Sequence, residues 1–224
     1  MSALHEIAGF EEVDRDGAIR EAAAEVHGDT RAELFRKGGI LALAGFGLGG
    51  AGVGGLALAQ GSGKGDVKIL NYALTLEYLE AAFYAEAISA GKLTGVAARF
   101  ARVVGEHEQA HVDALKQALG SKAVKSPSFD FKGTTKAQDS FLKTAMALED
   151  TGVAAYQGQA TNIKSDRVLA SAGAILAVEA RHAAWVRDII GAGKSPLPAP
   201  AAFNEAMSMS AVLDAVTATG FIKA

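Results

Sequence analysis

The sequence predicts an all-α protein whose main part is an antiparallel four-helix bundle. Half of the 224 residues are apolar and only 7% are aromatic, which is typical of closely packed helices rather than of a β-sandwich. Between residues 66 and 191, apolar residues recur at steps of three and four, the spacing of one buried helix face. Turn-forming residues interrupt this pattern, so we expect four helices.

Capping residues define the limits of the first two helices. Asp66 is a good N-cap for the first helix, which Gly91 ends, and Thr94 can cap a second helix that runs to Gly120. The stretch 122–135 then breaks the pattern with proline, glycine and serine. Because this link is long, it suits a crossover along the bundle, which places the first and third helices face to face.

The second pair of helices follows the same plan. Thr134 or Thr135 starts a third helix that runs to about Asn162. A fourth helix starts near Ser165 and stops at Gly191. The two pairs together predict one bundle domain.

Two further regions flank the bundle domain, which is expected to span residues 66–191. After it, residues 192–224 hold a proline-containing linker and a short helix within 201–218. Before it, residues 1–60 form a polar arm followed by an uncharged run at 40–59.

The run at 40–59 follows a basic segment and ends in small residues at Ala57 and Ala59, the layout of a secretory leader. Its twenty residues are also long enough for a membrane anchor, and a buried glycine-rich helix is a third interpretation. The basic segment resembles a twin-arginine export signal, although Ala32 replaces the second arginine and Phe35 is displaced by one place. We therefore expect an exported protein, periplasmic or extracellular, or one anchored in a membrane and facing outward.

Each buried stripe is interrupted near its middle by a glutamate, a residue that rarely faces an apolar core. The four glutamates are Glu77, Glu108, Glu149 and Glu179. In the second and fourth helices a histidine follows three residues later, as His111 and His182. In the first and third helices a tyrosine follows seven residues later, as Tyr84 and Tyr156. The two halves of the bundle thus repeat one pattern.

A lone ionised glutamate in an apolar core is costly, and four at one level would repel one another. Two divalent cations would cancel four carboxylates, and neutral imidazoles can join as ligands. Because positions i and i+3 share one helix face, each Glu-x-x-His pair can reach one metal pair together. Glu77 and Glu149 would complete the cage and could bridge the metals. The chain has no cysteine, so the ligands are hard donors that suit iron, manganese or zinc.

Residues 66–191 resemble the ferritin-like superfamily, and most closely its exported bacterial branch of uncharacterised and desiccation-related proteins, in the paired Glu-x-x-His motifs and in LNYALTLEYLEAAFY at 70–84. The resemblance implies a centre of two iron ions, with manganese as the alternative, that reacts with dioxygen or hydrogen peroxide. By that resemblance the metal ligands are Glu77, Glu108, His111, Glu149, Glu179 and His182. Tyr84 and Tyr156 match tyrosines that orient ligating side chains.

The family's activities include ferroxidation, peroxide reduction, oxygen activation and manganese catalase chemistry. An enzyme here would therefore be an oxidoreductase with a role in oxidative stress or iron handling. The alternative is a non-catalytic structural or stress protein that keeps the bundle. A satisfied polar core without metal is another interpretation of the glutamates, and Glu80, one turn from Glu77, is a rival ligand. Glu106 and His107 are expected on the solvated face.

The charge and composition of the chain indicate which kinds of binding partner are expected. The net charge is −3, and no basic patch with interleaved aromatic residues occurs, which argues against a nucleic-acid-binding function. A homodimer fits the sequence, whereas nothing in it specifies a hollow storage shell. Membrane association is expected only through residues 40–59.

Overall fold

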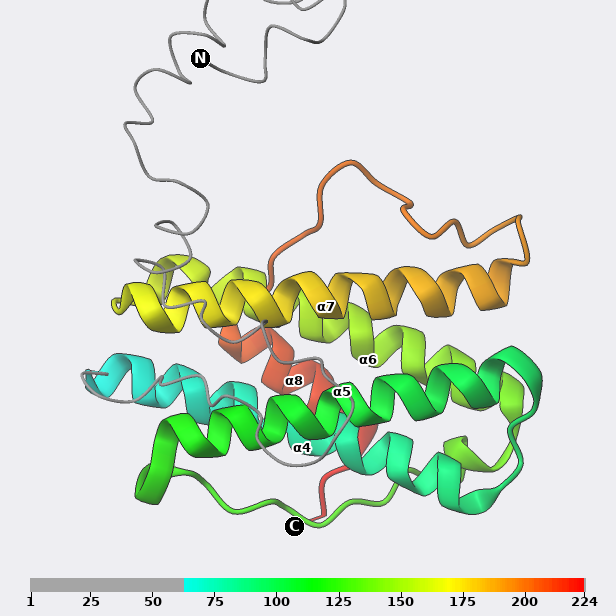
Figure 1. Cartoon of the computed structure of the whole chain (residues 1–224), viewed down its shortest axis with the longest axis horizontal. Helices are drawn as coiled ribbons and strands as arrows, with labels where there is room; N and C mark the ends of the chain where they lie inside the picture. The colour runs from blue at the N-terminus through cyan, green and yellow to red at the C-terminus, as the bar shows by residue number, and fades with distance from the viewer. Residues whose placement is uncertain (1–62, 224) are drawn as a thin grey trace, which may run out of the picture. The chain divides into compact units, whose positions relative to one another are not determined.

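The computed structural model describes residues 63–223, and there the only β geometry is an isolated bridge between Phe129 and Ile222. The α-helices of this part are α4 (Lys64–Ala90), α5 (Gly95–Leu119), α6 (Gln138–Gln159), α7 (Asp166–Gly191) and α8 (Met209–Thr219) (Figure 1). The predicted all-α fold is confirmed. Within residues 63–223, no helix combines the length and the apolar character needed to cross a membrane. The expected leader at 40–59 lies outside the described residues.

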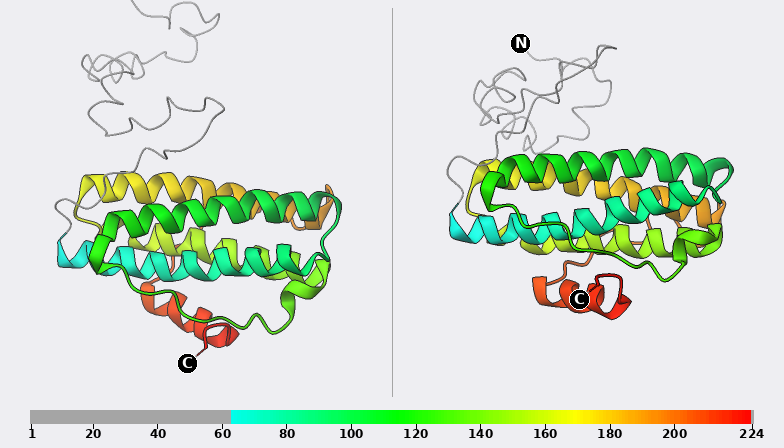
Figure 2. Two further views of the ribbon diagram at one scale, coloured as in Figure 1. Left: turned by 60° about the horizontal axis from the view of Figure 1, so that its bottom comes forward. Right: turned by 90° about the horizontal axis from the view of Figure 1, so that it is seen from below.

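The four long helices form a bundle of two helix pairs. α4 packs along α5 and α6 packs along α7, while α4 also meets α6 and α5 meets α7. The link from α5 to α6 runs along the length of the bundle, and α8 lies outside the four helices (Figure 2). Asn71 on α4 holds the start of this link, because its side chain bonds to the Lys122 carbonyl at 3.0 Å and to the Val124 N–H at 2.8 Å. The predicted crossover is therefore observed.

Several predicted helix limits agree with the structure. Gly91 ends α4 with a backbone φ of 63°, a left-handed conformation that glycine adopts without strain. Thr94 and Ser165 occupy the N-cap positions of α5 and α7, and the Ser165 side chain accepts a hydrogen bond from the Val168 N–H. α7 extends to Gly191 as expected.

The predicted start of the first helix is wrong. α4 begins at Lys64 after the N-cap Gly63, so Asp66 lies inside its first turn. The Asp66 side chain is buried, and its carboxylate accepts hydrogen bonds from the backbone N–H groups of Lys164 and Ser165, both at 2.9 Å. Asp66 thus pairs free N–H groups beside the start of α7, a tertiary role that capping patterns along one helix do not reveal.

Two other helices start later than predicted. Thr134–Lys136 form a separate 3-10 turn, and α6 begins only at Gln138. α6 ends at Gln159, and the last residues up to Asn162 form another 3-10 turn. The terminal helix likewise begins only at Met209. Short 3-10 turns are common at helix ends, and a hydrophobic pattern alone does not separate them from the α-helix.

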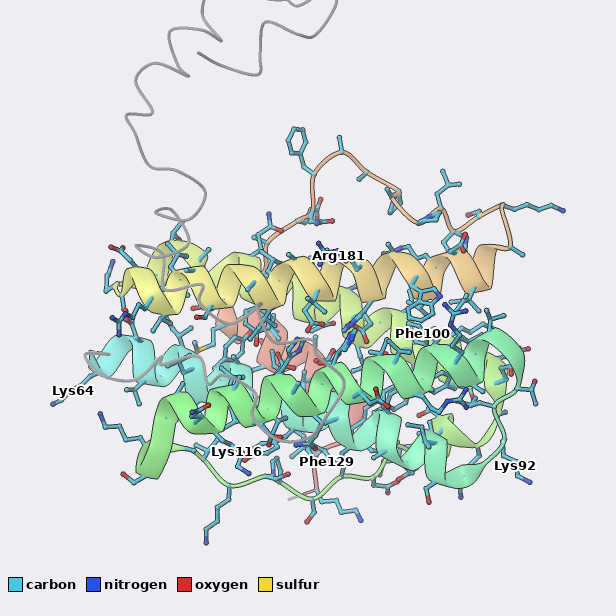
Figure 3. All side chains as sticks on the ribbon, in the orientation of Figure 1. Lys64, Lys92, Phe100, Lys116, Phe129 and Arg181 are labelled. Atoms are coloured by element: carbon cyan, nitrogen blue, oxygen red, sulfur yellow. The ribbon has the colours of Figure 1, made fainter. Side chains whose placement is uncertain are left out.

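Two apolar clusters fill the bundle at opposite ends of the long helices. One gathers around Phe83, Phe100 and Phe141 and reaches the inner face of α8. Phe100 lies between α5 and α7 (Figure 3). The other cluster gathers around Leu74 and Leu115. The glutamates of the buried stripes lie between these clusters in sequence, so apolar layers shield their level of the bundle from water.

Candidate metal centre

The four glutamates of the buried stripes meet in the middle of the bundle. All four are buried, with 0% of each residue exposed. They are Glu77 on α4, Glu108 on α5, Glu149 on α6 and Glu179 on α7. The repeat in the sequence places one glutamate of each helix at the same level, and the packing of the two helix pairs turns all four inward.

The first group of donors surrounds His111. Its Nδ1 atom lies 3.3 Å from Glu77 Oε2, 3.1 Å from Glu108 Oε2 and 3.1 Å from Glu179 Oε1. One ligating atom from each of these four residues lies within 4.8 Å of the others. The His111 side chain is 12% exposed, so this group borders on solvent. A single metal ion can be held by this set.

The second group surrounds His182. Its Nδ1 atom lies 3.0 Å from Glu108 Oε1 and 3.2 Å from Glu149 Oε2, and Glu179 Oε2 is 3.9 Å away. These four residues also offer atoms within 4.8 Å of one another. Glu108 and Glu179 belong to both groups. The carboxylates common to both groups are thus those of the Glu-x-x-His motifs, whereas Glu77 and Glu149 each belong to one group. That Glu77 and Glu149 bridge two metals stays a prediction.

A tyrosine from the facing helix occupies one oxygen of each unshared carboxylate. Tyr84 on α4 donates a hydrogen bond to Glu149 Oε1 on α6, and Tyr156 on α6 donates one to Glu77 Oε1 on α4. Both tyrosines are buried. Each unshared carboxylate thus has one oxygen bonded to a tyrosine and a second oxygen directed to its donor group. From these places the tyrosines would orient both ligands.

Several polar atoms of the cluster find no hydrogen-bond partner in the described part of the chain. They are Glu108 Oε1, Glu149 Oε2, both carboxylate oxygens of Glu179, and His182 Nδ1. A buried polar atom without a partner costs about 1–3 kcal/mol. A cation among these atoms would use their lone pairs, and carboxylate with imidazole donors suits iron, manganese or zinc. The residues present therefore fit a metal centre.

Burial and contacts between charged groups together shift the pKa values of the cluster. Burial, followed by the charge of Glu179, raises the pKa of Glu77 well above its ordinary value, and burial likewise raises the pKa of Glu149. Burial lowers the pKa of His182, but contacts with Glu108 and Glu149 outweigh it and raise this pKa to about 12. At Glu108 burial is outweighed by His111 and His182, which lower its pKa to about 2. Protons thus balance part of the negative charge when no metal is bound.

A fifth carboxylate, Glu80, lies beside the cluster but belongs to neither group. It is 3% exposed, and burial, with the charges of Glu179 and Glu149, raises its pKa well above the ordinary value. A Cβ at Gly152 would lie 3.3 Å from Glu179 Oε2 and 3.5 Å from Glu80 Oε1. Glu80 therefore lies close to Gly152 on α6, and Glu77 is the α4 carboxylate that belongs to a donor group.

The sequence pattern missed the contact made by His107. This residue is exposed overall, as is its neighbour Glu106. Nevertheless, Nδ1 of His107 lies 2.9 Å from Nε2 of His182, and the two rings are 19° from coplanar. The helical period of α5 places His107 outside the buried stripe, so the signal for this contact is only the extra imidazole in EHEQAH.

Comparison with known protein families matches the bundle. A family model described as a ferritin-like domain covers residues 65–192, which is more than half of the chain. The matched range contains both donor groups and both tyrosines. No curated protein matches the chain.

Proposed function

Because the chain belongs to the ferritin-like family and buries two overlapping groups of carboxylate and imidazole donors, we propose that it binds two iron ions, with manganese as the alternative, and reacts with dioxygen or hydrogen peroxide. The observation that carries this proposal is the set of buried carboxylate oxygens without partners. The corresponding role is ferroxidase-like or peroxidase-like, in iron handling or in protection against oxidative stress.

The ligands of the proposed centre divide between the two groups. One ion would be held through Glu77 and His111 and the other through Glu149 and His182, with both shared carboxylates contributing to each. When bound, the metal pair supplies the electrons for reduction of the oxidant. Tyr84 and Tyr156 hold the unshared carboxylates in place, and the apolar layers on either side limit the access of water.

The number of donors supports a reactive centre rather than a structural one. Each group contains four residues that offer one ligating atom apiece. An octahedral ion takes six donors, so an ion held through one atom of each residue would keep places for water or an oxidant. A structural site, in contrast, is closed by protein ligands.

The first experiment asks whether the cluster binds metal. The full chain is loaded anaerobically with Fe(II) or Mn(II), desalted and analysed for bound metal by mass spectrometry. We expect about two ions per chain for the wild type and almost none for Glu108→Ala combined with Glu179→Ala, since both shared ligands are lost. Glu106→Ala, an exposed change on the same helix, is the matched control and keeps the wild-type content. Equal metal in the wild type and the double variant would refute the proposal.

The second experiment separates reaction from structural support. Fe(II)-loaded protein is mixed with dioxygen or peroxide in a stopped-flow spectrometer, and Mn(II)-loaded protein is assayed for oxygen release from peroxide. The proposed function predicts absorbance changes much faster than those of free Fe(II), or oxygen release with manganese. A structural or stress protein of the same fold would bind metal and show neither.

We further propose that the run at 40–59 directs export, by the twin-arginine or the general route. The basic flank before it and the small residues at Ala57 and Ala59 support this. Fractionation of a bacterium that expresses the full chain, with N-terminal sequencing of the product, tests it. A cleaved leader gives an exported chain that begins near residue 60, whereas an anchor gives an intact chain in the membrane fraction.

A further inference from the structure

The two Glu-x-x-His motifs differ at the residue that precedes the glutamate. The first motif lies in EHEQAH at 106–111, and the second lies in AVEARH at 177–182. When the motifs are aligned on their glutamates, His107 of α5 corresponds to Val178 of α7. One half of the repeat thus carries an additional imidazole where the other half carries an aliphatic side chain.

The additional imidazole contacts the histidine of the opposite half. Nδ1 of His107 lies 2.9 Å from Nε2 of His182, with the ring centroids 5.1 Å apart and the planes 19° from coplanar. This is the geometry of a hydrogen bond in the plane of both rings. The other ring nitrogen of His182, Nδ1, faces Glu108 and Glu149. Nε2 of His182 is thus bound to His107, whereas Nδ1 lies among the carboxylates without a hydrogen bond.

His111 has no equivalent support. Its Nδ1 atom faces the first donor group, but no residue from 63 to 223 forms a hydrogen bond with its Nε2 atom. Val178, at the position that corresponds to His107, has no polar side-chain atom to offer. The two ligating histidines therefore differ in what holds their outer nitrogen.

We propose that His107 is a positioning residue that fixes the orientation and tautomer of His182, so that the metal position at His182 binds its ion more tightly and earlier than the position at His111. When Nε2–H of His182 donates to Nδ1 of His107, the lone pair of His182 Nδ1 is left free for the metal. A hydrogen bond to the outer nitrogen of a ligating histidine typically raises metal affinity by about 10- to 100-fold. This inference rests on the proposed function, because it concerns the same donor groups.

Replacement of His107 by residues that keep or remove the hydrogen bond tests the inference. His107→Val copies the residue at 178 and removes the acceptor. His107→Asn keeps an acceptor, since its side-chain oxygen takes nearly the place of the imidazole Nδ1. Gln109→Val is the matched control, because Gln109 is exposed on the same helix and bonds only to Asp113. All three changes are at exposed positions, and circular dichroism verifies that each variant remains folded.

The measurement is an anaerobic titration of the full chain with Mn(II), in which free Mn(II) is followed by electron paramagnetic resonance. We expect two unequal binding steps in the wild type and in Gln109→Val. In His107→Val the tighter step weakens by about 10- to 100-fold, and His107→Asn restores most of it. At half an equivalent of Mn(II), the imidazole NMR signals of His182 broaden before those of His111 in the wild type, and this order is lost in His107→Val.

Different outcomes separate this inference from the proposed function. If the wild type binds no Mn(II) or Fe(II), the proposed function fails and the inference fails with it. If two ions bind but His107→Val leaves both steps unchanged, the proposed function stands and the role of His107 is wrong. If His107→Asn behaves like His107→Val, the hydrogen bond is not the cause, which also overturns the inference.

Discussion

The two halves of the bundle carry the same glutamate and histidine donors at nearly the same spacing, but they differ at two positions beside these donors. The half formed by α4 and α5 adds Glu80 and His107, whereas the half formed by α6 and α7 has Gly152 and Val178 at the corresponding positions. Both of these residues approach the other half of the bundle, because Glu80 lies near Gly152 and His107 contacts His182. The repeated set of donors therefore has unequal surroundings in the two halves.

Removal of the metal, followed at different pH values, is expected to have the largest effect on the free energy of unfolding, because it changes both halves of the bundle at once. In the metal-free protein, the pKa values of Glu77 and Glu149 are raised, and that of His182 is raised to about 12. In the unfolded chain these groups have the pKa values of model peptides, about 4.3 for glutamate and about 6.5 for histidine. They therefore release their protons near these pH values. The native state thus holds more protons above these pH values.

Stability of the metal-free protein should therefore fall as the pH rises from about 5 to about 8, by up to about 1.4 kcal/mol per pH unit for each retained proton. The lowered pKa of His107 opposes this trend by one proton only. Metal binding releases the protons, so metal affinity should rise over the same range. Urea unfolding with and without Mn(II) at several pH values measures both trends. Metal-free stability that increased with pH would contradict the assigned proton states.

The shared and unshared glutamates provide the next comparison. Glu179→Gln is expected to weaken both metal positions by more than about 100-fold, because Glu179 belongs to both groups. Glu77→Gln removes a ligand from the His111 group alone and should leave about one ion bound at His182. Bound Mn(II) after desalting measures the difference. If the two variants retain equal metal, the division into shared and unshared ligands does not hold in solution.

The sequence predicted the parts of this site that depend on helical period. All four buried glutamates and both motif histidines meet in the structure, because steps of three and four residues fix which side of a helix faces the core. The tyrosines at seven-residue spacing from Glu77 and Glu149 also lie on the buried faces. Their bonds cross between the halves, with Tyr84 reaching Glu149 and Tyr156 reaching Glu77, and a pattern along one helix does not reveal such a partner.

The predictions from the sequence were wrong for side chains that contact another helix. Asp66 was expected to cap its own helix, but it bonds to the backbone before α7. His107 was assigned to the solvated face, yet its ring reaches His182 on a neighbouring helix. The carboxylates that belong to both donor groups, Glu108 and Glu179, are likewise identified only by the packing of the four helices. Each error concerns a long-range contact that only the packing of helices decides.

Removal of the tyrosine hydroxyl groups is expected to have a smaller effect, and an equivalent change can be made in each half of the bundle. Tyr84→Phe leaves Glu149 Oε1 without its donor, and Tyr156→Phe does the same to Glu77 Oε1. Each change should lower metal-free stability by about 1–3 kcal/mol, because a buried acceptor loses its partner. Each should also weaken one metal step by about 10-fold, at the His182 position for Tyr84→Phe and at the His111 position for Tyr156→Phe. Mn(II) titration with thermal unfolding tests this, and loss of the same step in both variants would contradict the crossed pairing.

Glu80→Gln is expected to have the smallest effect on metal binding, although Glu80 is the most conspicuous difference between the halves. Glu80 belongs to neither donor group, so the variant should still bind about two Mn(II) ions with nearly wild-type affinity. Burial raises the pKa of Glu80, so the neutral amide of glutamine replaces a protonated carboxyl. The variant therefore retains one proton fewer on folding, and its metal-free stability should fall less steeply with pH. Urea unfolding and Mn(II) titration of this variant show whether Glu80 is a buried protonated carboxyl beside the donor groups or a metal ligand. Loss of one bound ion would make Glu80 a ligand and would place the asymmetry of the two halves within the metal centre itself.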